Sequence, residues 1–214
     1  MTLPSPMKLI LASQSHRRRE LATSAGWDIT ITPPPECAEA SAPPLQPGET
    51  VQAFVTRLAH AKAEAVSKQL PPSEARAILA CDTVGEIGGV IFGKPTDTHD
   101  ARRMIETLSG KKHRGFTGVS IWFPEPAERI KANTSLGQYR VKEGCAISEV
   151  FMELLQKKEV DDYLATNDWH GKAGACGFQD GHLPLRLITG SVDTVVGLPV
   201  EFIEQLVIKH LRSR

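Results

Sequence analysis

Residues 9–20 have the sequence LILASQSHRRRE, in which an apolar run gives way to two serines and then to three arginines. The apolar run predicts a buried strand that ends at Ser13, and Ser15 is a suitable N-cap for a helix after it. Arginines in a first helical turn oppose the helix dipole, which favours anions there. Backbone N–H groups, hydroxyls and guanidinium groups at one strand–helix junction are typical of a phosphate site. A solvated basic helix end is the plainer alternative.

Composition narrows the possible partners. The 214-residue chain has 25 basic and 25 acidic residues, so no overall positive charge attracts a nucleic-acid polymer. Its first apolar run, residues 9–12, is too short for a membrane span or a secretory signal. The four cysteines form no CxxC pair, which argues against structural zinc. We therefore expect a cytoplasmic protein with free thiols and no membrane partner.

Apolar periodicity along the chain alternates between strand-like and helix-like segments. It predicts further strands at residues 27–32, 77–81, 90–92, 113–123, 138–147 and 185–188. It predicts helices at residues 49–70, 157–166 and 199–211, and one between a cap at Thr96 or Asp97 and Gly110. Neither GxGxxG nor GxxxxGK[ST] is present, so the pattern indicates an α/β or α+β protein that is neither Rossmann nor P-loop.

Lys62 lies on the apolar side of the predicted 49–70 helix, seven residues after Val55. A buried ammonium needs a partner, so Lys62 either meets an anion in a cleft or extends along the helix to water. Taken alone, the spacing favours extension to water, because amphipathic helices tolerate a long cation at the edge of the apolar side.

Three further residues could carry chemistry. Asp82 follows the apolar run 77–81, which we expect to end there, and it could act as a general base, a metal ligand or a turn cap. Lys94 lies in a Gly-Lys-Pro turn and could contact phosphate as a point charge. The glycine-rich segment 171–179 ends on Gln179, whose amide could contact a base edge, although a plain loop would look similar.

Together these candidates predict a site at which cations bind a polyphosphate and carboxylates hold a divalent metal ion while water attacks phosphorus. The cations are Arg17, Arg18, Lys62 and Lys94, and the carboxylates are Asp82 and Glu39.

Eight short blocks, in order along the chain, resemble those of the Maf family of nucleoside triphosphate pyrophosphatases, once described as septum-formation inhibitors. They are LASQSHRR at 11–18, LA and KA at 58–63, DTV at 82–84, GKP at 93–95, LSG at 108–110, TGV at 117–119, GKAG at 171–174 and GLP at 197–199. Glu39 also falls where the family has an acidic residue. The chain departs from the family pattern at His16, Gly85 and Asp193-Thr194.

The resemblance implies hydrolysis of a nucleoside triphosphate to the monophosphate and pyrophosphate, with Mg²⁺, Mn²⁺ or Co²⁺ as the divalent cation. It implies that Asp82 is the catalytic base or a metal-bound carboxylate, and that Glu39 helps to hold the metal. The residues implied to hold phosphates are Ser13, Arg18, Lys62 and Lys94. Those implied to select the base, as in the dTTP/UTP branch, are Arg17, Thr83 and Gln179.

The resemblance also implies a two-lobed α/β fold like that of inosine triphosphate pyrophosphatases. Its elongated mixed sheet would be flanked by helices around a central cleft, as one domain over residues 1–214 that forms a homodimer. Two alternative functions remain. One is the same chemistry on 7-methyl-GTP or another modified nucleotide, and the other is a nucleotide-binding regulator of cell division with little catalysis.

Overall fold

The structure is a computed structural model of the chain, and it describes residues 7–35, 43–71, 76–125 and 139–212. Its strands are β1 (Lys8–Leu11), β2 (Asp28–Ile31), β3 (Ile78–Ile87), β4 (Val90–Phe92), β5 (Lys112–Pro124), β6 (Tyr139–Met152) and β7 (Leu185–Thr189). Its helices are α1 (His16–Ser24), α3 (Val51–Ser67), α4 (Thr98–Leu108), α5 (Lys157–Ala165), α6 (Val192–Val196) and α7 (Val200–Arg212), with a 3₁₀ turn at Ala173–Ala175. None of the helices among these residues is long and apolar enough to cross a membrane.

The strands form a mixed sheet with the order β2-β1-β3-β5-β6-β7, and β4 pairs with β3 off this path. The β1 strand pairs in parallel with β2 and β3, whereas β3 with β4 and β6 with β7 are antiparallel. The predicted mixed α/β class is therefore confirmed. The chain divides into two compact units, which we call the first unit (residues 1–82, 118–145 and 198–214) and the second unit (residues 83–117 and 146–197).

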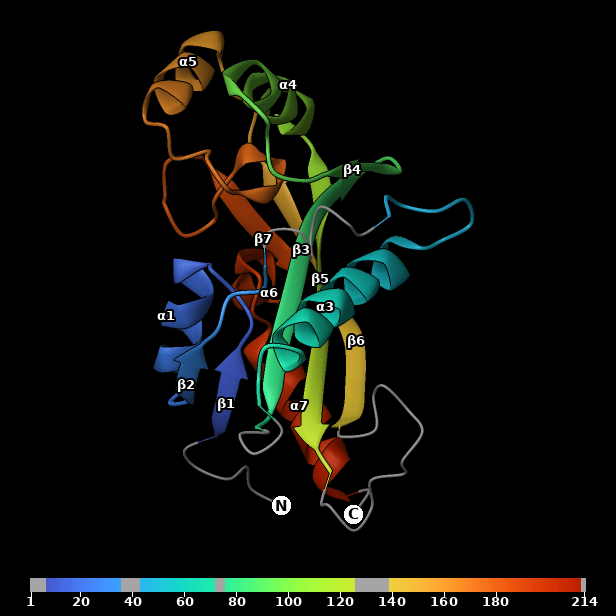
Figure 1. Cartoon of the computed structure of the whole chain (residues 1–214). Helices are drawn as coiled ribbons and strands as arrows, with labels where there is room; N and C mark the ends of the chain where they lie inside the picture. The colour runs from blue at the N-terminus through green and yellow to red at the C-terminus, as the bar shows by residue number, and fades with distance from the viewer. Residues whose placement is uncertain (1–6, 36–42, 72–75, 126–138, 213–214) are drawn as a thin grey trace. The chain divides into compact units, whose positions relative to one another are not determined.

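In the first unit, alternation along the strands separates two apolar layers. Leu9 and Leu11 of β1 pack in one layer with side chains of α1 and α7. Ile10, between them, packs in the other layer with Ala63 and Val66 of α3. Figure 1 shows α3 across one face of β3 and β5, with α7 behind these strands. Along β3, Ile78 and Ala80 likewise pack on the face that α3 covers, and Leu79 and Cys81 pack on the opposite face.

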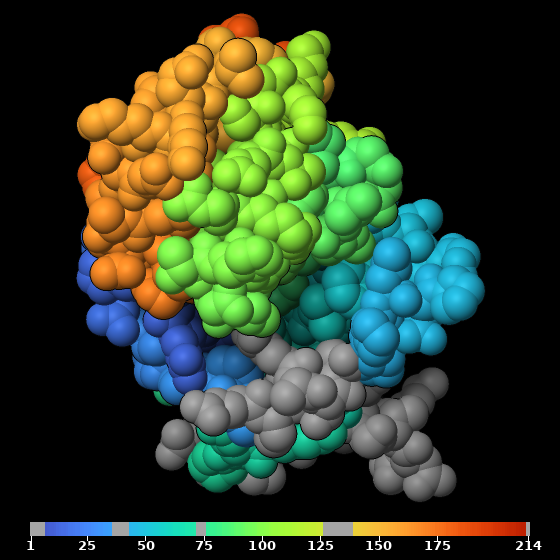
Figure 2. Space-filling view, turned by 90° about the horizontal axis from the view of Figure 1, so that it is seen from above, coloured from blue at the N-terminus to red at the C-terminus, as the bar shows by residue number. Residues whose placement is uncertain are grey.

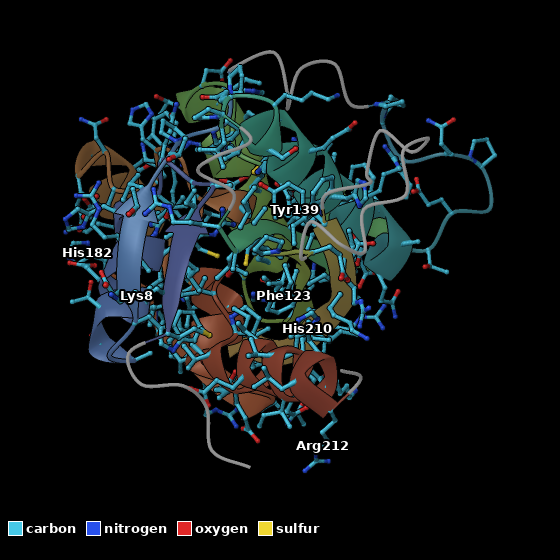
Figure 3. The ribbon with its side chains drawn as sticks, turned by 60° about the horizontal axis from the view of Figure 1, so that its bottom comes forward. Lys8, Phe123, Tyr139, His182, His210 and Arg212 are labelled. Atoms are coloured by element: carbon cyan, nitrogen blue, oxygen red, sulfur yellow. The ribbon has the colours of Figure 1, made fainter. Side chains whose placement is uncertain are left out.

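Two contacts fix the helices on the first unit's strands. A Cβ at Gly118 of β5 would lie 2.5 Å from the backbone nitrogen of Thr56 and closer still to the carbonyl of Val55, so α3 can approach the sheet only over a glycine. On α7, His210 stacks on Phe123 with ring centroids 3.7 Å apart and an angle of 11° between the rings (Figure 3). The close approach of α3 brings the side of that helix that carries Val55 against the strands.

In the second unit, β3 and β4 form an antiparallel hairpin, with Gly85 opposite Phe92. The helix predicted before Gly110 is confirmed as α4, which has an apolar face and Asp97 as its N-cap. This face is buried in a cluster with side chains of α5, and the two helices present a continuous surface in Figure 2. The buried residues of α4 are Ala101, Met104, Ile105 and Leu108.

One predicted strand end was wrong, and one helix was not predicted at all. We expected a strand to end at Asp82, but β3 continues to Ile87, because its second half pairs with β4 after its pairing with β1 has ended at Leu79. The short helix α6 was not predicted. Ser191 caps it and Gly197, at φ 109°, ends it after five residues, which is too short for an apolar period to show.

Candidate active site

Lys62 and Asp82 meet on the face of the sheet that α3 covers. Because side chains alternate along β3, Asp82 points to the same side as Ile78 and Ala80, which pack with α3. The Lys62 ammonium donates to Asp82 Oδ1, and the two side chains are only 6% and 14% exposed. The preference for a lysine that extends to water was therefore wrong, whereas the expected partner is present. The close packing of α3 holds the Lys62 ammonium at the sheet, where it pairs with Asp82 instead of extending along the helix to water.

The junction of β1 and α1 has the predicted form. Ser13 is buried, and its Oγ accepts from the backbone nitrogen of Ser15 at 3.1 Å and from Arg18 Nη1 at 3.4 Å. Ser15 caps α1 by accepting from the backbone nitrogen of Arg18 at 3.4 Å. No acidic side chain stands in the first turn, where Arg17 is half-buried. An anion at this helix start would therefore meet N–H groups, a hydroxyl and guanidinium groups.

The electrostatics of Cys81 link this junction to the ion pair. Burial raises the pKa of the Cys81 thiol to about 11, while the positive charges of Arg18 and Lys62 lower this pKa and the negative charge of Asp82 raises it. The Cys81 side chain itself is fully buried. Within the first unit, Ser13, Arg18, Lys62 and Asp82 come together, whereas Glu39 lies outside the described residues.

The remaining predicted residues lie in the second unit. Lys94 is exposed after β4, and Gln179 is exposed on the glycine-rich loop. The two segments that carry them are joined, because the Gly174 backbone nitrogen donates to the Gly93 carbonyl at 2.9 Å. Thr83 is half-buried and its Oγ1 lies 2.9 Å from Thr117 Oγ1.

An ion pair inside the glycine-rich loop was missed by the sequence analysis. Lys172 is buried and its ammonium contacts the carboxylate of Asp180, the residue after Gln179. A Cβ at Gly177 would overlap that carboxylate and lie 2.9 Å from the Lys172 Nζ, so the loop closes around the pair over a glycine. The glycine spacing indicated a tight loop, but no periodic pattern links residues 172 and 180.

Comparison with known proteins identifies the family. Residues 8–210 match the model of the family described as Maf-like protein.

The chain belongs to the Maf family.

Among curated relatives of this Maf chain, the "dTTP/UTP pyrophosphatase" of Geobacter sp. (strain M21) is 38% identical over 194 residues, 90% of each chain. The "dTTP/UTP pyrophosphatase" of Rhodopirellula baltica is 34% identical over 204 residues, which are 95% of this chain and 82% of the relative. Among solved structures, a HAM1 protein from Coxiella burnetii superposes with a TM-score of 0.43 at 14% identity, over 95% of this chain and 99% of the other.

The described residues of this Maf protein could supply only part of the ligands of a divalent cation. They contain no group of three or more His, Cys, Asp or Glu side chains that could hold a metal ion. Mg²⁺, however, is commonly held by one or two carboxylates, with water and substrate phosphates completing its ligands. Asp82 contacts Lys62, a cation suited to a phosphate. This carboxylate therefore fits a metal ion whose other ligands are water and the phosphates of a bound nucleotide.

Proposed function

We propose that this Maf protein hydrolyses dTTP and UTP to the nucleoside monophosphate and pyrophosphate. The observation that carries the proposal is the buried pair of Lys62 and Asp82. Burying an ammonium and a carboxylate together is costly, and an apolar pair would serve packing as well. Such a pair beside a serine–arginine helix start suits phosphoryl chemistry. The names of the curated relatives support the choice of nucleotides.

The residues of the first unit have distinct roles in this proposal. Arg18 and Lys62 supply positive charge to the triphosphate, which stabilises charge that develops during attack at the α-phosphorus. Asp82 accepts a proton from the attacking water, and its contact with Lys62 holds the carboxylate in one orientation. The Ser13 hydroxyl accepts from Arg18 Nη1 at 3.4 Å and would donate its own proton to a phosphate oxygen.

The other roles rest on the family motifs. A divalent cation, Mg²⁺, Mn²⁺ or Co²⁺, supplies charge neutralisation at the phosphates when bound, and Asp82 and Glu39 are the residues that would hold it. Lys94 would bind phosphate as a point charge. The residues that would select the base are Arg17, Thr83 and Gln179. We also propose that the protein is a homodimer, which light scattering of the purified protein can test.

The test is pyrophosphate release from dTTP, UTP, CTP, the purine triphosphates and 7-methyl-GTP, each with the three metal ions. Release from dTTP and UTP alone is the expected result. Release from 7-methyl-GTP alone would retain the chemistry and overturn the base preference. Nucleotide binding without any release would favour the regulatory protein instead.

Asp82→Asn should fold and lose most turnover, because an amide cannot take the proton from water. Asp162→Asn is the matched control, since Asp162 is 65% exposed and pairs only at the surface with Lys158. Full activity of Asp82→Asn would overturn the role of this carboxylate.

A further inference from the structure

A chain of hydrogen bonds in the second unit begins at Thr83. Thr117 is fully buried, and its Oγ1 donates to the backbone carbonyl of Thr194 at 2.7 Å. The same Oγ1 lies 2.9 Å from Thr83 Oγ1, where either hydroxyl could be the donor by distance alone. Thr194 is also buried. Thr117 therefore holds a buried hydrogen bond to Thr194 and a part-buried one to Thr83.

Counting protons removes the ambiguity between the two threonines. A hydroxyl has one proton to donate and two lone pairs that accept, whereas a carbonyl oxygen can only accept. The single proton of Thr117 is used on the Thr194 carbonyl. Thr83 must therefore donate to Thr117, and its Oγ1 can offer only lone pairs to a ligand.

The acceptor at the end of this chain is held in place. Ser191 Oγ caps the turn by accepting from the Thr194 backbone nitrogen at 3.4 Å. Ser191 is itself held by Ser148, whose buried Oγ donates to the Ser191 carbonyl at 2.9 Å and accepts from its backbone nitrogen at 3.0 Å. Turning the Thr117 proton away from Thr194 would leave a buried carbonyl without its donor, which is costly.

We propose that Thr117 is a positioning residue that makes Thr83 an obligate hydrogen-bond acceptor, and that this polarity selects a nucleobase with an imide N–H. The inference rests on the proposed function, which supplies a pyrimidine nucleotide and places Thr83 at its base. Thymine and uracil carry a proton on N3, whereas cytosine N3 carries a lone pair and would face the lone pairs of Thr83. Ionised phosphate oxygens also lack a proton to donate, so Thr83 is unsuited to phosphate.

The test compares kcat/KM for UTP, CTP and 3-deaza-UTP, in which a C–H replaces the imide N–H. The wild type should prefer UTP to each of the other two by at least about 10-fold, the usual effect of an unmatched buried polar group. Thr117→Val removes the hydroxyl at nearly constant volume and lets Thr83 turn its proton outward. The preference for UTP over CTP should then fall at least about 5-fold.

Thr117→Ser keeps the hydroxyl and should retain the preference for UTP. A preference that is lost in Thr117→Val but kept in Thr117→Ser depends on the hydroxyl and not on a general effect of substitution on folding. Thr83→Val is the second variant, and it should lose the discrimination against 3-deaza-UTP. The inference is overturned if the wild type turns over 3-deaza-UTP as well as UTP. It is also overturned if Thr117→Val keeps the full preference over CTP.

Equilibrium binding of the same nucleotides to Asp82→Asn, with and without Thr117→Val, separates this inference from the proposed function. If the wild type releases no pyrophosphate but this variant still binds UTP preferentially, only the proposed function fails. If UTP and CTP bind equally while the wild type hydrolyses UTP, only the inference fails. If neither nucleotide binds, both fail.

Discussion

The ammonium of Lys62 and the carboxylate of Asp82 form a buried ion pair although they lie 20 residues apart in the chain. Two periodicities bring them together. Lys62 follows Val55 by two helical turns, and Val55 lies against Gly118 of the sheet. Asp82 follows Ile78 and Ala80 on the strand face that packs with α3. The ion pair therefore depends on the docking of α3 with Val55 over Gly118.

Removing one partner of this pair should be more harmful than removing both. Lys62→Met leaves the carboxylate buried without its cation, and we expect a loss of about 3–5 kcal/mol in the free energy of unfolding. The double variant Lys62→Met/Asp82→Asn should recover part of that loss, because no charge stays unpaired. Urea denaturation measures both. Losses that simply add would show that the two groups do not depend on each other.

Gly118→Ala should prevent α3 from docking, because the added methyl would occupy the place of the Val55 and Thr56 backbone. Backbone atoms cannot turn aside as a side chain can, so we expect a loss of about 3 kcal/mol or more in stability. Gly115→Ala in the same strand is the matched control, since its Cβ would meet only Val195 Cα at 3.9 Å. Thermal unfolding of the two variants should differ clearly. Equal melting temperatures would contradict the close packing of α3.

Glu49 should make stability depend on pH in the acid range. Hydrogen bonds from the Arg57 side chain and then from the Gln46 backbone lower the pKa of Glu49 to about 2, from 4.5 in the absence of these partners. Folding favours the ionised form, so this contribution is complete above about pH 4.5 and disappears as the pH falls towards 2. The difference in unfolding free energy between wild type and Glu49→Gln should shrink over that range. A difference that is constant with pH would exclude this linkage.

Lys172→Met should loosen the glycine-rich loop, because Asp180 loses its buried partner. Amide hydrogens of residues 171–181 should exchange faster, and KM for UTP should rise more than kcat falls if Gln179 contacts the base. Lys158→Met is the control, since that lysine is 85% exposed in its pair with Asp162. Unchanged exchange in Lys172→Met would mean that other contacts, such as Gly174 with Gly93, hold the loop without the ion pair.

Local features of the structure were predictable because their causes are local. Ser15 and Asp97 cap their helices as expected, and the glycines at residues 85–89 accompany a hairpin. The end of β3 was misplaced because the polar residues Asp82 and Thr83 follow its apolar run. In the sequence they resemble the end of a strand, since the pairing of residues 85–87 with β4 cannot be seen there. The short helix α6 was not predicted because its limits are set by the N-cap Ser191 and the C-cap Gly197 and not by a repeating pattern of apolar residues.

By itself, the sequence determined the mixed α/β class, the serine–arginine helix start and the family motifs, since periodicity, caps and short blocks depend on residues a few positions apart. Only the tertiary structure decided that Lys62 is buried against Asp82, and that Thr117 donates to a carbonyl 77 residues away. A polar side chain finds its partner only when separate elements pack around it. The packing of those elements, which no local pattern encodes, decides whether a lysine reaches water and which way a threonine proton points.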